Sequence, residues 1–363
     1  MTVVLLLFPL LFLAVRLAIT LYNYFSRSYL PIVRRLDNPP FVSLLIIGDN
    51  DTPRMLYLID LLKRIPYMNM EILVGVYNPL QKSLAKIRES LLFDKRFHLI
   101  EIESVKKDWR HENFINYTLG NKAKGNYLLF MDPDLELQNG ILEILISYMR
   151  QQRLGLISVA PTHDLHTRAE WATLPIMNQL YLTIYPLGLV KKLSSLFAIA
   201  SREFMLFEGT VYRSFQPFDE TRIRCGGAEN IAHYLKSESI RIDCLIGDKR
   251  VRLLGSVTWR RCFAQLVSEL TPLIENYHIG ALLYSSILML WWIPFFLLEH
   301  FALFGIGIIE ILVTQILISS ITRINWKKSV VYYFQQTTVL FLAVWLSWRH
   351  SHHRHRKCRC LIV

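Results

Sequence analysis

Two aspartates separated by one residue are the clearest candidates for metal chemistry in this sequence. Asp132 and Asp134 flank Pro133 and directly follow residues 126–131, an apolar run with the composition of a buried strand. Carboxylates on alternate residues, held by a rigid proline, can present oxygen ligands to a hard divalent ion that also bridges a diphosphate. The spacing therefore predicts that this pair binds Mg²⁺ or Mn²⁺, although a solvated turn is the alternative for any Asp-x-Asp sequence.

The elements that would position this pair follow from the apolar patterning. Short, largely apolar runs predict buried strands at residues 42–47, 71–76, 98–102 and 126–131. Helical periodicity predicts helices at residues 55–63, 80–93 and 113–122. Because strands alternate with helices, the expected fold is α/β, with a parallel sheet covered on both faces. Open sheets of this type bind ligands at the carboxyl ends of their strands, which is where Asp132 follows its strand.

Length and composition restrict the class of protein. The chain has 363 residues, a formal net charge of +12 and 52% hydrophobic residues, and its mean hydropathy is +0.28. These values exclude a disordered chain, a collagen-like repeat and a small disulfide-stapled domain. The five cysteines lack C-x-x-C spacing, so neither a zinc ribbon nor a secreted disulfide framework is expected. No nucleic-acid partner is expected either.

A transmembrane anchor is predicted at residues 1–25. Residues 2–22 are almost entirely apolar and long enough to cross a hydrocarbon core of about 30 Å, and their one charge, Arg16, could snorkel toward the interface. Basic residues follow this run and none precedes it, so the positive-inside bias places the next domain in the cytoplasm. Residues 26–40, which end in Pro39 and Pro40, form the expected linker.

Further membrane segments are predicted after the soluble domain, which is expected to cover residues 41–258. Residues 279–298 and 301–321 are apolar and predict a hairpin that enters and leaves the bilayer. A third stretch, residues 330–348, is either re-entrant or interfacial. Two to three membrane segments are therefore expected within residues 279–348, which makes the protein a multi-pass membrane protein with a cytoplasmic catalytic domain.

Two other segments are expected to contact membrane lipids. Residues 259–276 have apolar residues at helical spacing opposite a polar face, which predicts an amphipathic helix on the headgroups or an ordinary helix packed on the core. The tail, residues 349–363, is basic and rich in histidine. Because its cations would oppose metal binding, we expect it to seek phosphate groups.

The order of motifs in residues 41–258 resembles that of the family 2 inverting glycosyltransferases. The motifs that carry the resemblance are Asn50-Asp51 after the first strand, Trp109 ahead of a helix, Asp132-Pro133-Asp134 after the strand at 126–131, the run Phe204-Met205-Leu206-Phe207, and Glu229-Asn230 ahead of a helix. The sequence is most similar to the membrane-anchored, lipid-modifying branch, which includes carotenoid (CrtQ-like) and ceramide or hopanoid glucosyltransferases. The resemblance implies the GT-A fold, a Rossmann-like fold of nucleotide-diphospho-sugar transferases.

The resemblance also implies roles for individual residues. Those roles are donor binding for Asn50, Asp51, Asn78, Trp109 and Asp132, metal binding for Asp132 and Asp134, and catalysis for Glu229 and Asn230. The sequence departs from the family at Asn78 and Asn230, where the family has acidic residues. An amide cannot accept the proton of an acceptor hydroxyl, so Glu229 is the expected base by default.

The predicted function is therefore a membrane-bound inverting glycosyltransferase of the hexosyltransferase type. By the resemblance, its partners are a nucleotide-sugar donor, expected to be a UDP-sugar, and a lipid acceptor, with a divalent metal as cofactor. The alternative is a pseudo-glycosyltransferase that keeps the fold and binds a nucleotide or a partner protein without turnover. Asn230 favours the alternative, whereas the retained Asp132 and Asp134 favour the enzyme.

Overall fold

The computed structural model describes residues 2–26, 30, 38–48, 52–65, 67–78, 81–91, 94–192, 194–223, 227–254, 258–274 and 277–354. The chain forms two compact units, each of which is described by itself. Residues Ser28–Thr162 and Leu189–Leu254 make up the sheet unit. Residues Met1–Arg27, His163–Gly188 and Gly255–Val363 make up the helical unit.

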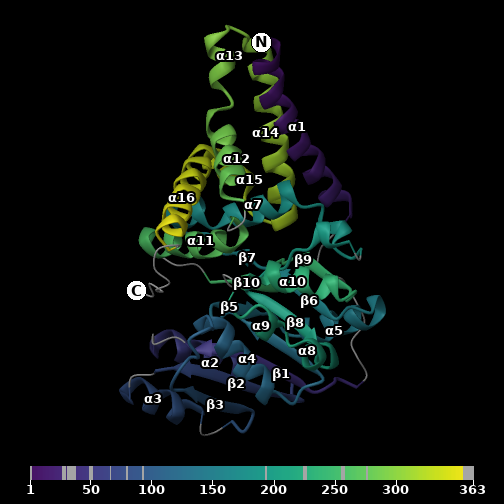
Figure 1. Ribbon diagram of the computed structural model, residues 1–363, viewed down its shortest axis with the longest axis vertical. Coiled ribbons are helices and arrows are strands. Elements are labelled where there is room, and N and C mark those ends of the chain that lie inside the picture. The colour runs from purple at the N-terminus through teal and green to yellow at the C-terminus, as the bar shows by residue number, and fades with distance from the viewer. Residues whose placement is uncertain are drawn as a thin grey trace. The chain divides into compact units, whose positions relative to one another are not determined.

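The sheet unit is built on a seven-stranded sheet (Figure 1). Its strands are β1 (Val42–Gly48), β2 (Met70–Tyr77), β3 (Phe97–Ile102), β4 (Tyr127–Met131), β6 (Leu156–Ala160), β8 (Phe204–Glu208) and β9 (Ile242–Ile246). They lie in the order β3-β2-β1-β4-β8-β6-β9. A second sheet has the order β5-β10-β7, with β5 at Leu135–Leu137, β7 at Thr162–His163 and β10 at Val251–Leu253. All four strands predicted from apolar runs are confirmed as β1 to β4.

The central sheet is mixed but parallel-rich, so the expectation of a parallel sheet is confirmed only in part. The first four strands are parallel to one another, but β8 is antiparallel to both of its neighbours, β4 and β6. A short helical crossover returns the chain to the edge where it started and makes the next strand parallel. The chain between β4 and β8 is far longer, and it enters β8 at the edge where β4 ends, so that the Asp132 N–H donates to the Glu203 carbonyl at 2.9 Å.

Helices cover both faces of this sheet, as the alternation of strands and helices predicts. They are α2 (Thr52–Lys63), α3 (Gln81–Leu91), α4 (His111–Lys122), α5 (Ile141–Gln152), α8 (Gly209–Phe215), α9 (Pro217–Glu220) and α10 (Ala228–Ser237), with a 3-10 turn at Ser195–Phe197. On one face, Ile46 of β1 belongs to the same buried core as Met55 of α2. On the other face, a side chain added at Gly75 of β2 would meet Ile115 and Leu119 of α4.

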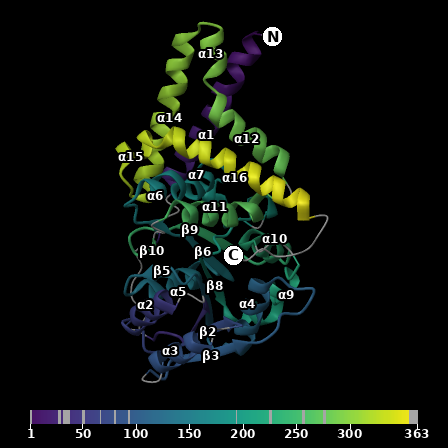
Figure 2. The ribbon, with the colours of Figure 1, turned by 90° about the vertical axis from the view of Figure 1, so that its left-hand side faces the viewer.

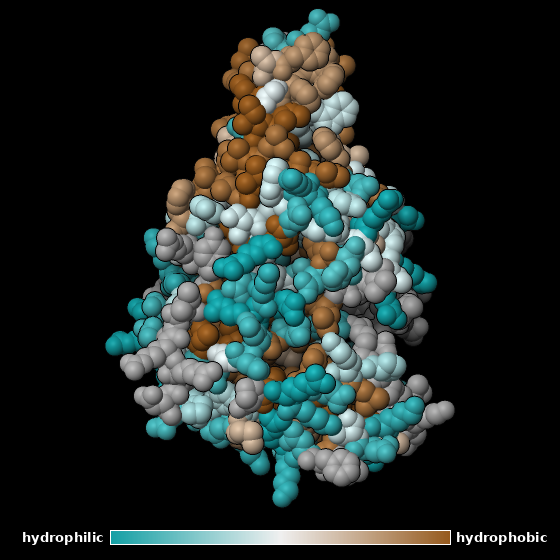
Figure 3. Space-filling view, turned by 180° about the vertical axis from the view of Figure 1, so that it is seen from behind, coloured by the Kyte–Doolittle hydropathy of each residue, from teal (hydrophilic) through white to brown (hydrophobic). Residues whose placement is uncertain are grey.

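The helical unit contains the apolar segments. Its helices are α1 (Thr2–Ser26), α6 (Arg168–Thr173), α7 (Pro175–Ile184), α11 (Trp259–Ile274), α12 (His278–Leu290), α13 (Ile293–Leu297), α14 (Phe301–Thr322), α15 (Trp326–Val331) and α16 (Tyr333–Arg354), with a 3-10 turn at Leu187–Leu189. In the described part of the chain, two helices are long and apolar enough to cross a membrane, Val3–Ser26 and Phe301–Thr322. Apolar side chains cover much of the outer surface of this unit (Figure 3).

The apolar stretch at residues 279–298 forms two helices, α12 and α13, instead of one. Pro294 lies in the first turn of α13. Its ring would clash with the carbonyl four residues earlier, and it has no N–H to donate, so a continuous helix is interrupted there. Downstream, α16 covers most of residues 330–348, packs against α12, and runs obliquely across the other helices of this unit in Figure 2.

Buried amides join helices of the helical unit that are distant in sequence. The Gln179 amide of α7 donates to the Gln336 side chain of α16 at 2.7 Å, and Gln336 in turn donates to the Trp171 carbonyl of α6 at 2.7 Å. The Asn23 amide of α1 donates to the carbonyls of Leu182 and Tyr185 at 3.0 and 2.8 Å. These bonds satisfy polar groups that would otherwise be costly to bury.

Candidate active site

One edge of the central sheet collects the ends of β1, β2 and β4 and the start of β8. Met131, the last residue of β4, pairs with Ile46 near the end of β1 and with Phe204 at the start of β8. Gly48 at the end of β1 pairs with Val76 of β2. Residues that follow the parallel strands and residues that precede β8 therefore meet at this edge, which is where open sheets of this type bind ligands.

Asp132 and Asp134 form a tight turn directly after β4. The Asp134 N–H donates to the Asp132 carboxylate oxygen Oδ1 at 2.8 Å, and the Leu135 N–H donates to the Asp132 carbonyl at 3.1 Å. The Asp134 carbonyl accepts a hydrogen bond from the Leu254 N–H at 2.9 Å. The turn therefore fixes the Asp132 carboxylate at the sheet edge, and both side chains are half-buried and within reach of solvent.

These two carboxylates fit a metal ion that completes its shell with substrate oxygens. Within the described residues, no group of three or more His, Cys, Asp and Glu side chains forms a metal site on its own. Mg²⁺ characteristically takes one or two protein carboxylates together with waters and substrate phosphates. A pair of hard oxygen donors at a ligand-binding edge suits that type of ion.

Glu203 connects the Asp132 turn to Glu229. Its carbonyl accepts the hydrogen bond from the Asp132 N–H at 2.9 Å, and its buried carboxylate accepts a hydrogen bond from the Ser201 hydroxyl. The Glu203 charge also acts on the Glu229 carboxyl, which lies in the first turn of α10. Three chain segments thus bring carboxylates to the same edge of the sheet.

The Glu229 carboxyl has an unusual acidity. Desolvation and, to a smaller extent, the neighbouring Glu203 charge raise its pKa to about 8, while a backbone hydrogen bond and the Arg202 cation oppose the rise. Arg202 also pairs with Glu112, in the first turn of α4, at 3.3 Å. A carboxyl with this pKa becomes a stronger base once ionised than an ordinary glutamate, which is the property required of a group that accepts a hydroxyl proton.

The other residues expected at the site have varied surroundings. Asn230 follows Glu229 in the first turn of α10. Asn78, just after β2, is exposed and has a left-handed φ of 42°. Trp109 packs against Phe114 and Tyr117 of α4, with ring centroids 5.4 and 4.8 Å apart. Asn50 and Asp51 lie outside the described residues.

Sequence reasoning missed the charged residues that precede β8 and start α4, namely Arg202, Glu203, Glu112 and His111. His111 packs edge-on against Tyr77, with ring centroids 4.8 Å apart, and its buried Nδ1 has no hydrogen-bond partner among the described residues. The available signal for Glu203 was its position immediately before an apolar strand. The position of Glu203 becomes informative only when the direction of β8 is known. Because β8 is antiparallel to β4, it starts at the edge where β4 ends, and Glu203 therefore lies at the site.

Lys236, near the end of α10, has a structural role. Its side-chain nitrogen donates to the carbonyls of Ser194 and Phe197 at 3.0 Å each. Burial lowers its pKa to about 8, although the charge of Asp243 opposes the change. Lys236 therefore ties α10 to the Ser195–Phe197 turn.

Comparisons with known proteins support this fold. No protein-family model and no curated protein matches the sequence. Among solved structures, the chain is similar to the mannosyltransferase PcManGT from Pyrobaculum calidifontis in complex with GDP-Man and Mn²⁺, with a TM-score of 0.54, 12% identity, and coverage of 94% of this chain and 98% of that chain.

Two structures of S. aureus TarS 1–349 also match, one of them in complex with UDP-GlcNAc. Their TM-scores are 0.42 and 0.40, and both are 12% identical over 89% of this chain and 94% of theirs. The mannosyltransferase, with the higher TM-score, is the structure on which the comparison rests. The chain therefore has a mixed α/β fold, with a parallel-rich central sheet, similar to that of a nucleotide-sugar-dependent glycosyltransferase.

Proposed function

We propose that this protein is a membrane-bound inverting glycosyltransferase of the hexosyltransferase type. It moves a hexose from a nucleotide-sugar donor to a lipid-like acceptor. The observation that supports it most is the convergence of Asp132, Glu203 and Glu229 at the ligand-binding edge of the sheet. In a fold similar to that of a GDP-Man-bound mannosyltransferase, such an edge is suited to hold a diphosphate beside a base.

In the proposed reaction, Glu229 accepts the proton of the acceptor hydroxyl while the hydroxyl oxygen bonds to the anomeric carbon of the donor sugar. The bond from that carbon to the diphosphate oxygen breaks, and the nucleoside diphosphate leaves with the electron pair. Attack and departure take place on opposite faces of the sugar, so the configuration inverts. Positioning of the two substrates supplies a large part of the rate enhancement.

Asp132 and Asp134 are the proposed metal ligands. A bound Mg²⁺ or Mn²⁺ ion would supply positive charge that stabilises the departing diphosphate. The hydrogen bond from the Asp134 N–H fixes the Asp132 carboxylate, which supports its proposed role as a ligand for such an ion. We further propose Asn50, Asp51, Asn78 and Trp109 as donor contacts.

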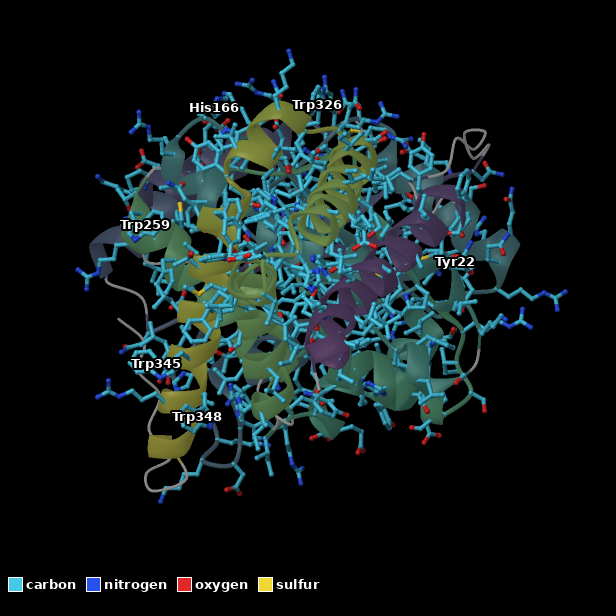
Figure 4. The ribbon with its side chains drawn as sticks, turned by 90° about the horizontal axis from the view of Figure 1, so that it is seen from above. Tyr22, His166, Trp259, Trp326, Trp345 and Trp348 are labelled. Atoms are coloured by element: carbon cyan, nitrogen blue, oxygen red, sulfur yellow. The ribbon has the colours of Figure 1, made fainter. Side chains whose placement is uncertain are left out.

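The membrane location is supported by the apolar helices and by tryptophans in the helical unit. Figure 4 shows Trp259, Trp326, Trp345 and Trp348 away from the centre of this unit. Trp326 and Trp345 each lie beside a cation, Lys327 and Arg349, at 5.8 and 5.7 Å from the ring centroids. Tryptophans and basic residues in this combination are typical of the membrane–water interface. The proposed orientation keeps the catalytic residues on the cytoplasmic side.

A transfer assay tests the proposal. Full-length protein in detergent is incubated with labelled UDP- and GDP-sugars, a lipid extract and Mg²⁺ or Mn²⁺, and the labelled lipid is measured. We expect transfer that depends on the metal and falls by about a hundredfold or more in Asp134→Ala and Glu229→Gln. Asp60→Ala, which removes an exposed carboxylate of α2, is the matched control and retains activity.

A non-catalytic function is the second candidate, and Asn230 is the observation that favours it. Its test is calorimetric binding of the same nucleotides to the same variants. Nucleotide binding without transfer to any lipid supports a pseudo-glycosyltransferase. A protein that binds no nucleotide sugar contradicts the transferase and the nucleotide-binding form of the second candidate, and leaves only its partner-binding form.

A further inference from the structure

Arg16 is an arginine enclosed by the helices of the helical unit. It lies on α1, its side chain is 5% exposed, and its Nε donates to the Tyr284 hydroxyl of α12 at 3.1 Å. The guanidinium carbon is 5.8 Å from the centre of the same ring. Arg16 is ten residues before the end of α1 at Ser26, about 15 Å along the helix axis.

The positive charge of Arg16 has no carboxylate partner in the described part of the chain. The described ion pairs all involve other cations. The polar groups that act on Arg16 are the phenols of Tyr284 and Tyr333. A buried cation that is not compensated is expensive in an apolar environment, so a compensating anion is needed.

The hydrogen-bond donors and acceptors around Arg16 also indicate that an anion is missing. The Thr183 hydroxyl donates to the Gln179 carbonyl at 2.7 Å, so at its 3.1 Å contact with Tyr284 it is the acceptor. The Tyr284 hydroxyl therefore both donates and accepts. The buried Tyr333 hydroxyl interacts with the Arg16 guanidinium, to which it can only be the acceptor, and no described residue accepts its proton.

The cluster thus contains more donors than acceptors. A guanidinium carries five N–H groups, and the described interactions with the Tyr284 and Tyr333 hydroxyls account for two of them. The Tyr333 proton also lacks an acceptor. The missing partner is consequently an acceptor with negative charge and several oxygens, because a guanidinium fork binds such groups through parallel N–H···O bonds.

We propose that Arg16 and Tyr333, held in place by Tyr284, form a binding site for a phosphate group inside the helical unit. The site is built by α1, α12 and α16, and it uses none of the residues of the proposed transfer reaction. A phosphate can come from an anionic lipid or from free phosphate in solution. The exposed apolar side chains of these helices, such as Val4, Leu283 and Leu342, make the lipid the natural source.

The test measures the thermal unfolding midpoint of the full-length protein in a maltoside detergent, which carries no phosphate. Dioleoyl phosphatidic acid is compared with dioleoylglycerol, which has the same chains without phosphate, and inorganic phosphate is compared with chloride at equal ionic strength. We expect phosphatidic acid to raise the midpoint by several degrees, since a ligand that binds the folded state stabilises it. Dioleoylglycerol and chloride are expected to leave the midpoint unchanged.

Three variants show whether the effect comes from this cluster. Arg16→Gln abolishes the shift, and Tyr333→Phe, which keeps the ring, weakens phosphatidic acid binding by about tenfold, equal to about 1.4 kcal/mol. Arg260→Gln removes an exposed arginine of α11 and leaves the shift intact. If Arg16→Gln does not fold, Tyr333→Phe alone decides.

The outcomes are distinct. A shift with inorganic phosphate equal to that with phosphatidic acid supports the phosphate site and assigns it to free phosphate, whereas a shift with phosphatidic acid alone assigns it to a lipid. Equal shifts with phosphatidic acid and dioleoylglycerol, no shift with either phosphate source, or an undiminished shift in Tyr333→Phe overturn the proposal. Sugar transfer is not part of this readout, so failure here leaves the proposed function unaffected.

Discussion

Glu229 lies next to an amide, Asn230, and is half-buried. Desolvation and, to a smaller extent, the Glu203 charge give its carboxyl a pKa of about 8. If it is the base, transfer requires its ionised form. We expect kcat/KM to rise about tenfold per pH unit below pH 8 and to level off above it. The measurement is a pH–rate profile of lipid glycosylation.

Asn230→Asp provides the matched comparison for that profile. It adds a carboxylate one residue away, in the same first turn of α10. If an acid at this position can serve as base, the variant becomes active at lower pH than the wild type. A wild-type rate independent of pH between about 6 and 9 would exclude Glu229 as the base, since a group with this pKa must titrate in that interval.

The same pKa also predicts how stability depends on pH. The folded-state pKa of Glu229, about 8, is above the reference value of 4.5, so between these values the folded state binds a proton that the unfolded state releases. The contribution of this group to stability is therefore present at low pH and is lost as pH rises through this window. Glu229→Gln should flatten the dependence and unfold at a higher temperature than wild type above pH 8.

Calorimetry over this pH range checks the prediction. Glu220→Gln, at an exposed carboxylate of α9, is the control and should follow the wild-type curve. A wild-type midpoint that rises between pH 5 and 8, with Glu229→Gln below it throughout, would contradict the buried neutral carboxyl. The pH range to be compared runs from the reference pKa of Glu229, 4.5, to its folded-state pKa, about 8.

At the scale of elements, Gly120 of α4 is a position where alanine should destabilise the protein, although alanine is the better helix former. Ala normally stabilises a helix by about 1 kcal/mol relative to Gly. A side chain at Gly120 would instead collide with the Tyr212 ring, which is fully buried and packed against Phe130 and Phe218. We expect Gly120→Ala to destabilise the protein by about 2 kcal/mol, since overpacking costs about 1–3 kcal/mol.

Chemical denaturation of Gly120→Ala and of the double variant with Tyr212→Phe measures this cost. The Tyr212 hydroxyl is buried without a partner among the described residues, so Tyr212→Phe alone should be neutral or slightly stabilising. In the double variant the loss should be partly relieved, because the hydroxyl is the nearest colliding atom. A stabilised Gly120→Ala would show that α4 is not tightly packed there.

The elements show what the sequence could and could not predict. Strands β1 to β4 and helices α2 to α4 follow from continuous apolar runs and helical periodicity, and the amphipathic pattern at residues 259–276 gives α11 almost to its ends. The direction of β8 has no local signal, because it depends on where a long connection returns to the sheet. For that reason Asp132 and Glu229 could be proposed from sequence, whereas Glu203 could not.

At the scale of the whole molecule, the apolar outer face of the helical unit predicts how the protein partitions. Phe8 of α1 and Ile309 of α14 are 55% and 61% exposed. A lysine near the centre of a membrane helix costs about 3 kcal/mol. The double variant Phe8→Lys/Ile309→Lys should therefore leave the membrane fraction in large part during alkaline carbonate extraction.

The control for that extraction places the same two charges on the sheet unit. Tyr57 and Met68 are 54% and 79% exposed there, and Tyr57→Lys/Met68→Lys should remain with the membrane as wild type does. If both double variants stay in the membrane fraction, the exposed apolar faces of α1 and α14 do not contact lipid.

The composition of the two units was the least predictable feature at this scale. Residues 163–188 lie within a stretch of soluble character, yet they group with the apolar helices. Their assignment depends on partners such as Asn23, Gln315 and Gln336, which are distant in sequence. Local patterning carries no information on such pairings.

The interrupted course of the helical unit has a consequence for biosynthesis. The ribosome delivers α1 and α7 early, so Asn23 can pair with Leu182 and Tyr185 while translation continues. The Gln179 amide must wait for Gln315 and Gln336, which emerge only after the last strand of the sheet unit has been made. A nascent chain that stalls before α14 would therefore display an unpaired amide in α7, a signal that a membrane quality-control protease could recognise.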